Sequence, residues 1–164
     1  MYGAIIGDLV GSIYEYDEFR DSLKGKINLE RRLQILSKKE LITAECFYSD
    51  DTILTIAILS SILDNIPYEE NLRKYAKLYK NSIPTNMQYF NYMFSPGFLK
   101  WAESNSIGKS AGNGAAMRIS PVAYLFNEKE EIIEETKKAT IPSHNNKEAI
   151  EGALAVTKLI LKMP

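Results

Sequence analysis

The run from Ile53 to Leu63 constrains the fold most, because its apolar side chains surround a helix on nearly all sides. A helix that is apolar all round lies in the centre of a domain or spans a membrane. This run is too short for a membrane span, and threonine and serine interrupt it. The sequence therefore predicts a central, buried helix that begins at Asp50 or Asp51 and ends at Asp64.

Helical periodicity and helix-capping residues recur along most of the remaining chain. The further predicted helices are Tyr2–Glu15, one opened by Pro67, Pro96–Glu103, one after Gly114 that is interrupted at Ser120-Pro121, Glu128–Thr140 and Lys147–Lys162. The two-residue alternation of β-strands never runs far, and turn residues do not come in hairpin pairs. We therefore expect a single all-α domain over residues 1–164.

Residues 17–41 form a charged, mixed stretch between the first two predicted helices. One interpretation is a solvated connection with a short helix over residues 30–37. The other is a long functional loop that covers a site. The sequence leaves both interpretations open.

The composition is that of an ordinary globular protein, with 45% hydrophobic and 25% charged residues in 164. A net charge of −1 and the lack of a basic stripe argue against a nucleic-acid-binding protein. The single cysteine, Cys46, excludes an internal disulfide and a zinc–cysteine cluster, and it suits a reducing compartment. The first residues lack the basic region of a signal peptide. We expect a soluble, cytoplasmic protein that does not enter a membrane.

The first predicted helix carries two unusual stripes. The glycines of one stripe are Gly3, Gly7 and Gly11. Glycine is unfavourable in an exposed helix, so this stripe predicts that another helix packs very close against it. On a different stripe, Asp8 and Glu15 share a face with Ser12. Two carboxylates on one face of an otherwise apolar helix indicate a functional or structural partner.

The central helix begins with two adjacent carboxylates, Asp50 and Asp51, between Ser49 and Thr52. One explanation is helix capping, because negative charge in the first turn contributes roughly 0.3–1 kcal/mol. One aspartate suffices for that, and burying two charges without a cation is costly. Two carboxylates with hydroxyls also supply the hard oxygen ligands that Mg²⁺ favours. Capping and metal binding both remain open on this motif alone.

The segment SAGNGAAMR, from Ser110 to Arg118, places two glycines around an asparagine just before a helix. Free backbone N–H groups at such a start form an anion site, and the planar guanidinium of Arg118 matches a phosphate. The alternative is a glycine-rich turn with Arg118 in a surface ion pair. His144, the only histidine, stands before the last predicted helix and is either a loop or capping residue or a functional one. A nucleophilic triad around it is excluded because no second histidine or nearby cysteine exists.

Taken in order, these motifs resemble the ADP-ribosylglycohydrolase family, which includes the dinitrogenase-reductase-activating glycohydrolases. The matching segments are GAIIGDLVGSIYE from Gly3, YSDDT from Tyr48, SPGFLKWAES from Ser95, GNGAAMRISPVA from Gly112 and SHNNKEAIEGALAV from Ser143. Each motif is weak alone, whereas the ordered set is specific. The resemblance implies an all-α, multi-helix orthogonal bundle around a binuclear Mg²⁺ or Mn²⁺ site.

The resemblance also implies roles for the residues at matching positions. The implied metal ligands are Ser49, Asp50 and Asp51. The implied catalytic carboxylates are Glu15, near the scissile bond, and Asp8 in support. The implied substrate-binding residues, around the diphosphate, ribose and remaining ADP-ribose, are Ser110, Gly112, Asn113, Gly114 and His144, with Arg118 as the phosphate-matching side chain. The implied activity is metal-assisted hydrolysis of the glycosidic bond that joins ADP-ribose to a protein or a small molecule.

The chain departs from the family pattern in two places. Ala111 stands where the family often has an aromatic residue before the glycine loop, which removes one pocket wall. The family also carries a second acidic motif of the Asp-x-Asp-Thr type late in the chain, whereas the last aspartate here is Asp64. We therefore expect the bundle to be truncated at its C-terminus.

Three hypotheses follow from these departures. The chain is a portion of an ADP-ribosylglycohydrolase, weakly active or inactive alone and completed by another chain. Alternatively, it is a degenerate module that binds ADP-ribose or a nucleotide without turnover, or a helical structural protein whose acidic pair caps a helix. Because a truncated bundle exposes apolar surface, we also expect self-association.

Overall fold

The structure, a computed structural model, describes residues 2–15, 41–44, 46–85 and 92–162, with residues 13–15 described as backbone. Its helices are α1 (Tyr2–Glu15), α3 (Asp50–Asp64), α4 (Tyr68–Tyr79), α5 (Pro96–Glu103), the 3₁₀ turn η2 (Asn113–Ala115), α6 (Ser120–Leu125), α7 (Lys129–Thr140) and α8 (Lys147–Leu161). An isolated antiparallel bridge pairs Lys109 with His144, and the described ranges contain no strand. The all-α prediction is confirmed for these residues. The helix predicted over residues 30–37 lies outside them.

Local capping explains where the helices begin and end. Ser49 starts α3, because its hydroxyl accepts a hydrogen bond from the backbone N–H of Asp51 at 3.2 Å. Asn65 ends that helix in the left-handed conformation, with φ of 52°. Ser95 and Asn146 cap α5 and α8 through their side chains in the same way as Ser49. None of the described helices has the length and apolar character needed to cross a membrane.

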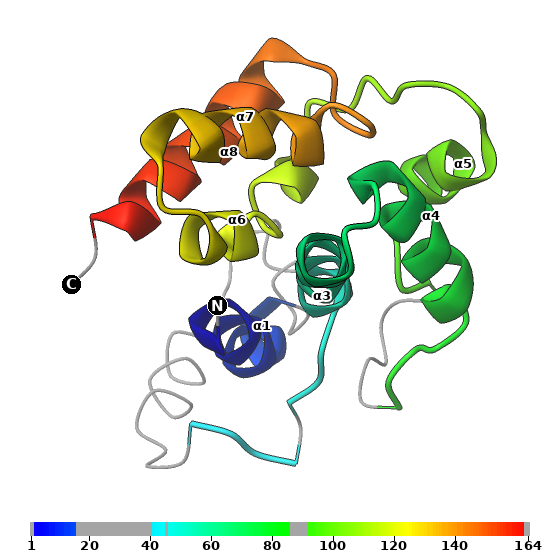
Figure 1. Cartoon of the computed structure of the whole chain (residues 1–164). Coiled ribbons are helices and arrows are strands. Elements are labelled where there is room, and N and C mark those ends of the chain that lie inside the picture. Colours follow the sequence, from blue (N-terminus) through cyan, green and yellow to red (C-terminus); the bar gives the residue numbers. More distant parts are fainter. Residues whose placement is uncertain (1, 16–40, 45, 86–91, 163–164) are drawn as a thin grey trace, which may run out of the picture.

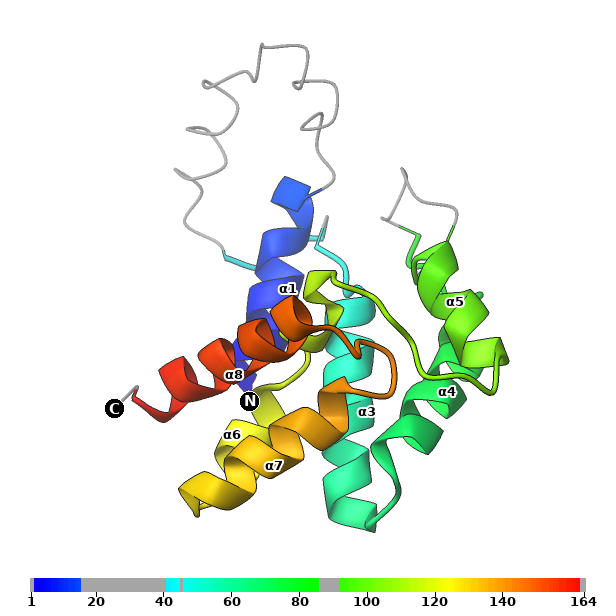
Figure 2. The same cartoon turned by 90° about the horizontal axis from the view of Figure 1, so that it is seen from above.

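The helices form an orthogonal bundle with α3 at its centre. α3 contacts α1, α4 and α6, and Figure 1 shows it nearly end-on between α1 and α4. α8 packs against α7, α6 and η2. In Figure 2, α8 runs across the direction of α3 rather than along it. The predicted fold class is therefore confirmed.

The apolar core draws one or more side chains from each of α3 to α8. Among those almost completely buried are Leu54, Leu72, Val122, Ala139 and Ala153. Burial of such side chains is the main favourable contribution to folding, at about 25 cal/mol per Å² of apolar surface. The core therefore fixes how the loops between these helices lie, including those that carry the predicted substrate-binding residues.

The sequence predicted that α3 is buried on nearly all sides. α3 is central, but one of its faces is exposed. Ile56 is 37% exposed and Leu63 is 67% exposed. The neighbouring helices α1, α4 and α6 cover only part of the circumference of α3 within the described ranges. The prediction of burial on nearly all sides is therefore wrong for one face.

The glycine stripe of α1 also differs from its prediction. A Cβ atom built at Gly3, Gly7 or Gly11 would find no described atom within 4 Å. Next to this stripe, Tyr2 is 76% exposed and Ile6 is 50% exposed. The predicted close approach of a second helix is thus wrong for the part of the chain that the structure describes, because α1 packs on α3 through its polar stripe instead.

Candidate functional site

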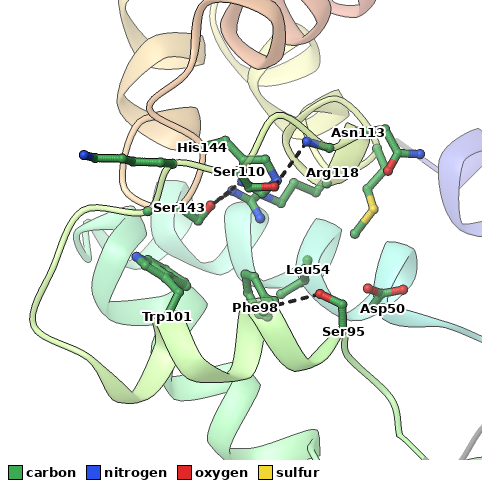
Figure 3. A pocket seen from close by; sticks show the side chains of 16 residues that line it. Asp50, Leu54, Ser95, Phe98, Trp101, Ser110, Asn113, Arg118, Ser143 and His144 are labelled. Atoms are coloured by element: carbon green, nitrogen blue, oxygen red, sulfur yellow. Dashed lines mark hydrogen bonds between the residues drawn. The ribbon is translucent and has the colours of Figure 1, made fainter.

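A cavity of about 400 Å³ lies where the start of α3, helix α5, the glycine loop and the segment before α8 meet. Figure 3 shows Arg118, Ser143 and His144 on one side and Ser95, Phe98 and Trp101 on the other. Asp50 lies at the edge of this second side, at the head of α3. Four segments between residues 50 and 144 therefore build one site.

Backbone hydrogen bonds hold the glycine loop against the segment before α8. The N–H of Gly108 donates to the carbonyl of Pro142 at 2.8 Å, and the N–H of Asn145 donates to the carbonyl of Gly108 at 2.9 Å. A Cβ at Gly108 would lie 2.2 Å from the carbonyl oxygen of Ser143, so only glycine permits this approach. A Cβ at Gly114 would lie 2.9 Å from His144 Nε2. His144 therefore lies directly against Gly114 in the glycine loop.

Three buried polar side chains form a chain under the cavity. Arg118 Nη2 donates to Ser143 Oγ at 2.7 Å and to the carbonyl of Ala139 at 3.3 Å. Ser143 Oγ lies 2.7 Å from His144 Nδ1. Arg118 is fully buried, and its Nε and Nη1 have no hydrogen-bond partner in the described structure. The alternative of a surface ion pair for Arg118 is therefore wrong.

Burial controls the charge of this chain. It lowers the pKa of Arg118 to about 9, with the negative charge of Asp50 acting in the opposite direction, so the guanidinium remains charged at neutral pH. Burial also lowers the pKa of His144 to about 4, and the positive charge of Arg118 adds to that effect. The imidazole is therefore neutral at physiological pH, beside a guanidinium that is charged at that pH.

The opposite wall is aromatic, and the sequence did not single it out. The rings of Phe98 and Trp101 lie 5.2 Å apart between centroids. The guanidinium of Arg73 lies 4.4 Å from the centroid of the Trp101 ring, within the range of a cation–π interaction. The available signals were the Ser95-Pro96 cap and the segment SPGFLKWAES, which predicted the short helix but not which way its aromatic side chains point.

A second polar cluster joins α1 to the start of α3. Asp8 Oδ2 accepts hydrogen bonds from the N–H of Ser49 at 2.9 Å, the N–H of Thr52 at 3.2 Å and the hydroxyl of Thr52 at 2.5 Å. Asp8 Oδ1 accepts from the hydroxyl of Ser49 at 2.7 Å. One turn later, Ser12 accepts from the N–H of Phe47 at 3.0 Å. The polar stripe of α1 therefore caps α3 from outside and fixes the segment that leads into it.

Comparisons with known proteins identify the family of this chain. The sequence model of the ADP-ribosylglycohydrolase family matches residues 1–163. The chain belongs to the ADP-ribosylglycohydrolase family. It is also similar to the ADP-ribosylhydrolase ARH3 of Xenopus tropicalis, at 24% identity over 177 aligned residues. That alignment covers 94% of this chain and 46% of the relative, so the chain spans under half of the relative's length.

In this ADP-ribosylglycohydrolase-family chain, the predicted substrate-binding residues come together. All six line the same cavity: Ser110, Gly112, Asn113, Gly114, Arg118 and His144. Of the predicted metal ligands, only Asp50 also lines it. Ser49 and Asp51 lie in the second cluster with Asp8. The side chain of Glu15 falls outside the described part of the structure.

The start of α3 suits a divalent cation in part. Burial raises the pKa of Asp51, and the negative charge of Asp8 raises it further. A cation beside Asp51 would offset both effects, and Asp50 and Asp51 offer hard oxygen donors. The oxygens of Asp8, in contrast, already accept four hydrogen bonds. Within the described ranges, no three His, Cys, Asp or Glu side chains gather as a group of metal ligands.

Proposed function

We propose that this chain is the ADP-ribose-binding part of a hydrolase that cleaves ADP-ribosyl glycosidic bonds on a protein or small-molecule acceptor. The observation that carries the proposal is the convergence of all six predicted substrate-binding residues on one cavity. Its volume of about 400 Å³ lies in the range of small-molecule sites. Family membership and the activity in the name of the relative support the same substrate class.

The proposed binding mode follows from the chemistry of the cavity walls. The exposed glycine loop around Asn113 offers backbone N–H groups to a diphosphate, and the buried charge of Arg118 attracts it electrostatically. Phe98 and Trp101 provide the apolar wall that a base or ribose ring packs against. Because Ala111 replaces the aromatic residue common in the family, this aromatic wall takes a larger share of the contact.

The proposed catalytic carboxylates act differently from one another. Asp8 holds the head of α3 through its four hydrogen bonds, so its proposed support is positional. Glu15, two turns further along α1, is proposed to assist proton transfer at the scissile bond. Asp50 and Asp51, with Ser49, would hold Mg²⁺ or Mn²⁺, in a binuclear site when complete. When bound, such an ion polarises an oxygen and lowers the pKa of a water molecule.

Manganese binding tests the metal proposal directly. We expect calorimetric titration of Mn²⁺ to give a binding isotherm with the wild-type chain. The double variant Asp50→Asn/Asp51→Asn should bind at least tenfold more weakly. Asp64→Asn, at the other end of α3, is the matched control and should bind as wild type does. Equal binding by the double variant would remove the metal role from this acidic pair.

Tryptophan fluorescence tests the cavity. Trp101 is the only tryptophan in the chain and lies in the cavity wall. We expect ADP-ribose to change its emission in a saturable way, and the response to be lost in Asn113→Ala. A response to ADP alone of equal strength would show that the distal ribose is not recognised. No response at any ligand concentration would contradict the proposal.

A second candidate is a half-enzyme or a binding module without turnover. The alignment covers 46% of the relative's length, and a turnover assay separates this candidate from the first. We expect ADP-ribosylated protein to be hydrolysed slowly or not at all by the isolated chain, although ADP-ribose binds. Restored turnover on adding a chain that carries an Asp-x-Asp-Thr motif would identify a half-enzyme. Robust turnover that survives Glu15→Ala would contradict our site assignment.

We also propose that the exposed apolar side chains of α1 and α3 drive self-association or the binding of a complementing chain. Tyr2 and Ile6 of α1 and Leu63 of α3 are exposed in the described structure. Light scattering of the wild-type chain should show a concentration-dependent mass that falls toward the monomer in Ile6→Lys. A monomer at every concentration would contradict self-association. We place the protein in the cytoplasm, which suits its single cysteine.

A further inference from the structure

The buried chain of Arg118, Ser143 and His144 contains a residue whose role neither the sequence motifs nor the family resemblance assigned. Ser143 lies between a guanidinium and an imidazole, at 2.7 Å from Arg118 Nη2 and 2.7 Å from His144 Nδ1. Its hydroxyl has no third partner among the described hydrogen bonds. This arrangement limits where the protons lie.

The direction of each hydrogen bond follows from the groups involved. A guanidinium only donates, so Ser143 Oγ is the acceptor of the bond from Arg118. The oxygen could also accept a bond from Nδ1–H, but the buried hydroxyl proton of Ser143 would then have no acceptor among the described contacts, so we infer that it points to His144 Nδ1. A nitrogen that accepts this proton carries none of its own. In a neutral imidazole, the ring proton then sits on Nε2.

The other ring nitrogen faces the glycine loop. A Cβ at Gly114 would lie 2.9 Å from Nε2 and 3.1 Å from Cε1 of His144. Both Gly114 and His144 line the cavity. Since Nε2 carries the proton, it presents a hydrogen-bond donor at this edge of the cavity.

We propose that Ser143 is a positioning residue that fixes His144 in the Nε2–H tautomer, so that the cavity offers a neutral donor to a phosphate or hydroxyl oxygen of the ligand. The tautomer depends only on the contacts of Ser143. The class of ligand rests on the proposed function. Discrimination follows, because a donor-only nitrogen leaves a ligand donor group at the same position unpaired.

The charged groups around His144 keep its ring in one protonation state. Arg118 lies beneath it, Lys109 pairs with it through the backbone bridge, and Asp50 lies across the cavity. Burial and the charge of Arg118 hold the pKa of the imidazole near 4. The donor is therefore present over the whole neutral range and does not switch with pH.

Nitrogen NMR of ¹⁵N-labelled protein tests the tautomer, because the chain has one histidine and so one pair of ring nitrogens. At pH 7 we expect one protonated nitrogen assigned to Nε2 and one unprotonated nitrogen assigned to Nδ1. Ser143→Ala should give an averaged spectrum of both tautomers, whereas Ser143→Thr keeps the hydroxyl and should restore the wild-type spectrum. Ser110→Ala, in the same cavity without a bond to His144, should leave the spectrum unchanged.

Two results would overturn the tautomer proposal: a protonated Nδ1 in the wild type, or a Ser143→Ala spectrum identical to that of the wild type. The wild-type spectrum alone decides the first, even where Ser143→Ala fails to fold. For the ligand, saturating ADP-ribose should move the Nε2 signal, and Ser143→Ala should weaken binding roughly two- to tenfold.

The ADP-ribose titration separates the two proposals. A Trp101 response with an unmoved Nε2 signal would overturn the ligand contact of His144 while the tautomer stands. No Trp101 response would overturn the proposed function, and the tautomer would again be judged from the ligand-free spectra alone.

Discussion

The two polar clusters of this chain, one under the cavity and one at the head of α3, are opposite in their chemistry. Under the cavity, Arg118 keeps two N–H-bearing nitrogens without acceptors in the described structure. At the head of α3, Asp51 and Asp8 bring negative charges together, and the pKa of Asp51 is raised by burial and by that neighbour. The first cluster has unpaired donors, and the second has crowded negative charge.

This difference teaches what each region is suited to bind. An anionic group stabilises a buried cation with unpaired donors, and a cation stabilises crowded carboxylates. Asp50 belongs to both regions, because it starts α3, lines the cavity and acts on the charge of Arg118. An anionic ligand in the cavity would therefore lie beside Asp50. The following changes test the contrast, from the largest expected effect to the smallest.

Gly108→Ala should damage the cavity region most. Its Cβ would stand 2.2 Å from the carbonyl oxygen of Ser143, where backbone cannot yield easily. We expect a loss of about 3 kcal/mol in the free energy of unfolding, measured by urea denaturation. Gly97→Ala is the control, because Gly97 lines the same cavity but a Cβ there would have no described atom within 4 Å. Equal stability of the two variants would show that the loop does not approach Ser143 so closely.

Acid should weaken the cavity region through His144. Its folded-state pKa of about 4 lies below the ordinary value of 6.5, so between these values the unfolded chain binds more protons. The stabilising contribution is complete above pH 6.5 and is lost as the pH falls toward 4, by roughly 2–3 kcal/mol in total. Between pH 7 and pH 4.5, the urea midpoint of unfolding should fall further for the wild type than for His144→Gln. Parallel falls would mean that the ring titrates normally.

Asp8→Asn should weaken the head of α3. An amide offers one oxygen in place of a carboxylate that accepts four hydrogen bonds, and it carries no charge. We expect a loss of about 2 kcal/mol, measured by thermal or urea unfolding. Asp64→Asn, whose carboxylate accepts from the exposed hydroxyl of Ser60, should change stability little. A loss for Asp64→Asn as large as that for Asp8→Asn would remove the special role of this cap.

Gly7→Ala tests the uncovered face of α1. Alanine is better than glycine in a helix, and the new methyl group meets no described atom. We expect a gain of about 0.5–1 kcal/mol in stability by urea denaturation. If light scattering shows self-association through this face, the same variant should weaken it. Destabilisation of the monomer would mean that something in the chain covers the glycine stripe.

Asp51→Asn should give the smallest effect, and in the opposite direction from Asp8→Asn. Because the folded-state pKa of Asp51 is raised above 3.8, its charge is less favourable in the folded than in the unfolded chain. Without metal at pH 7, the variant should unfold at a slightly higher urea concentration than the wild type, by a few tenths of a kcal/mol. A clear loss of stability would show that Asp51 is a structural cap, as Asp8 is.

Much of the helical framework could be read from the sequence because its signals are local. The Ser49 and Ser95 caps, the proline after Ser95 and the apolar period placed α3 and α5 within a residue of where they lie. The predictions that were wrong concern which other helices pack against a given helix. Neither the open stripe at Gly7 nor the exposed Leu63 follows from the period of one helix, because coverage depends on which helices pack there.

The candidate site divides in the same way. The ordered set of sequence motifs identified the glycine loop, the acidic pair and His144 as candidate functional features. They did not assign a role to Ser143 or Trp101. The sequence around these two residues does not distinguish a functional side chain from one that only packs in the core. Their roles depend on contacts made across long stretches of chain, such as Arg118 to Ser143 and Arg73 to Trp101.

By itself, the sequence determined the all-α class, most of the helix starts and the set of residues with the chemistry to hold a phosphate or a cation, although Ser120 begins α6 rather than interrupting a helix. Those properties are written in residue types and in spacings of a few positions. Only the tertiary structure decided that Arg118 is buried, that Asp8 caps a helix other than its own and that the predicted substrate-binding residues share one cavity. Burial and long-range hydrogen bonds arise when helices pack, and packing sets the protonation and the partners of each group.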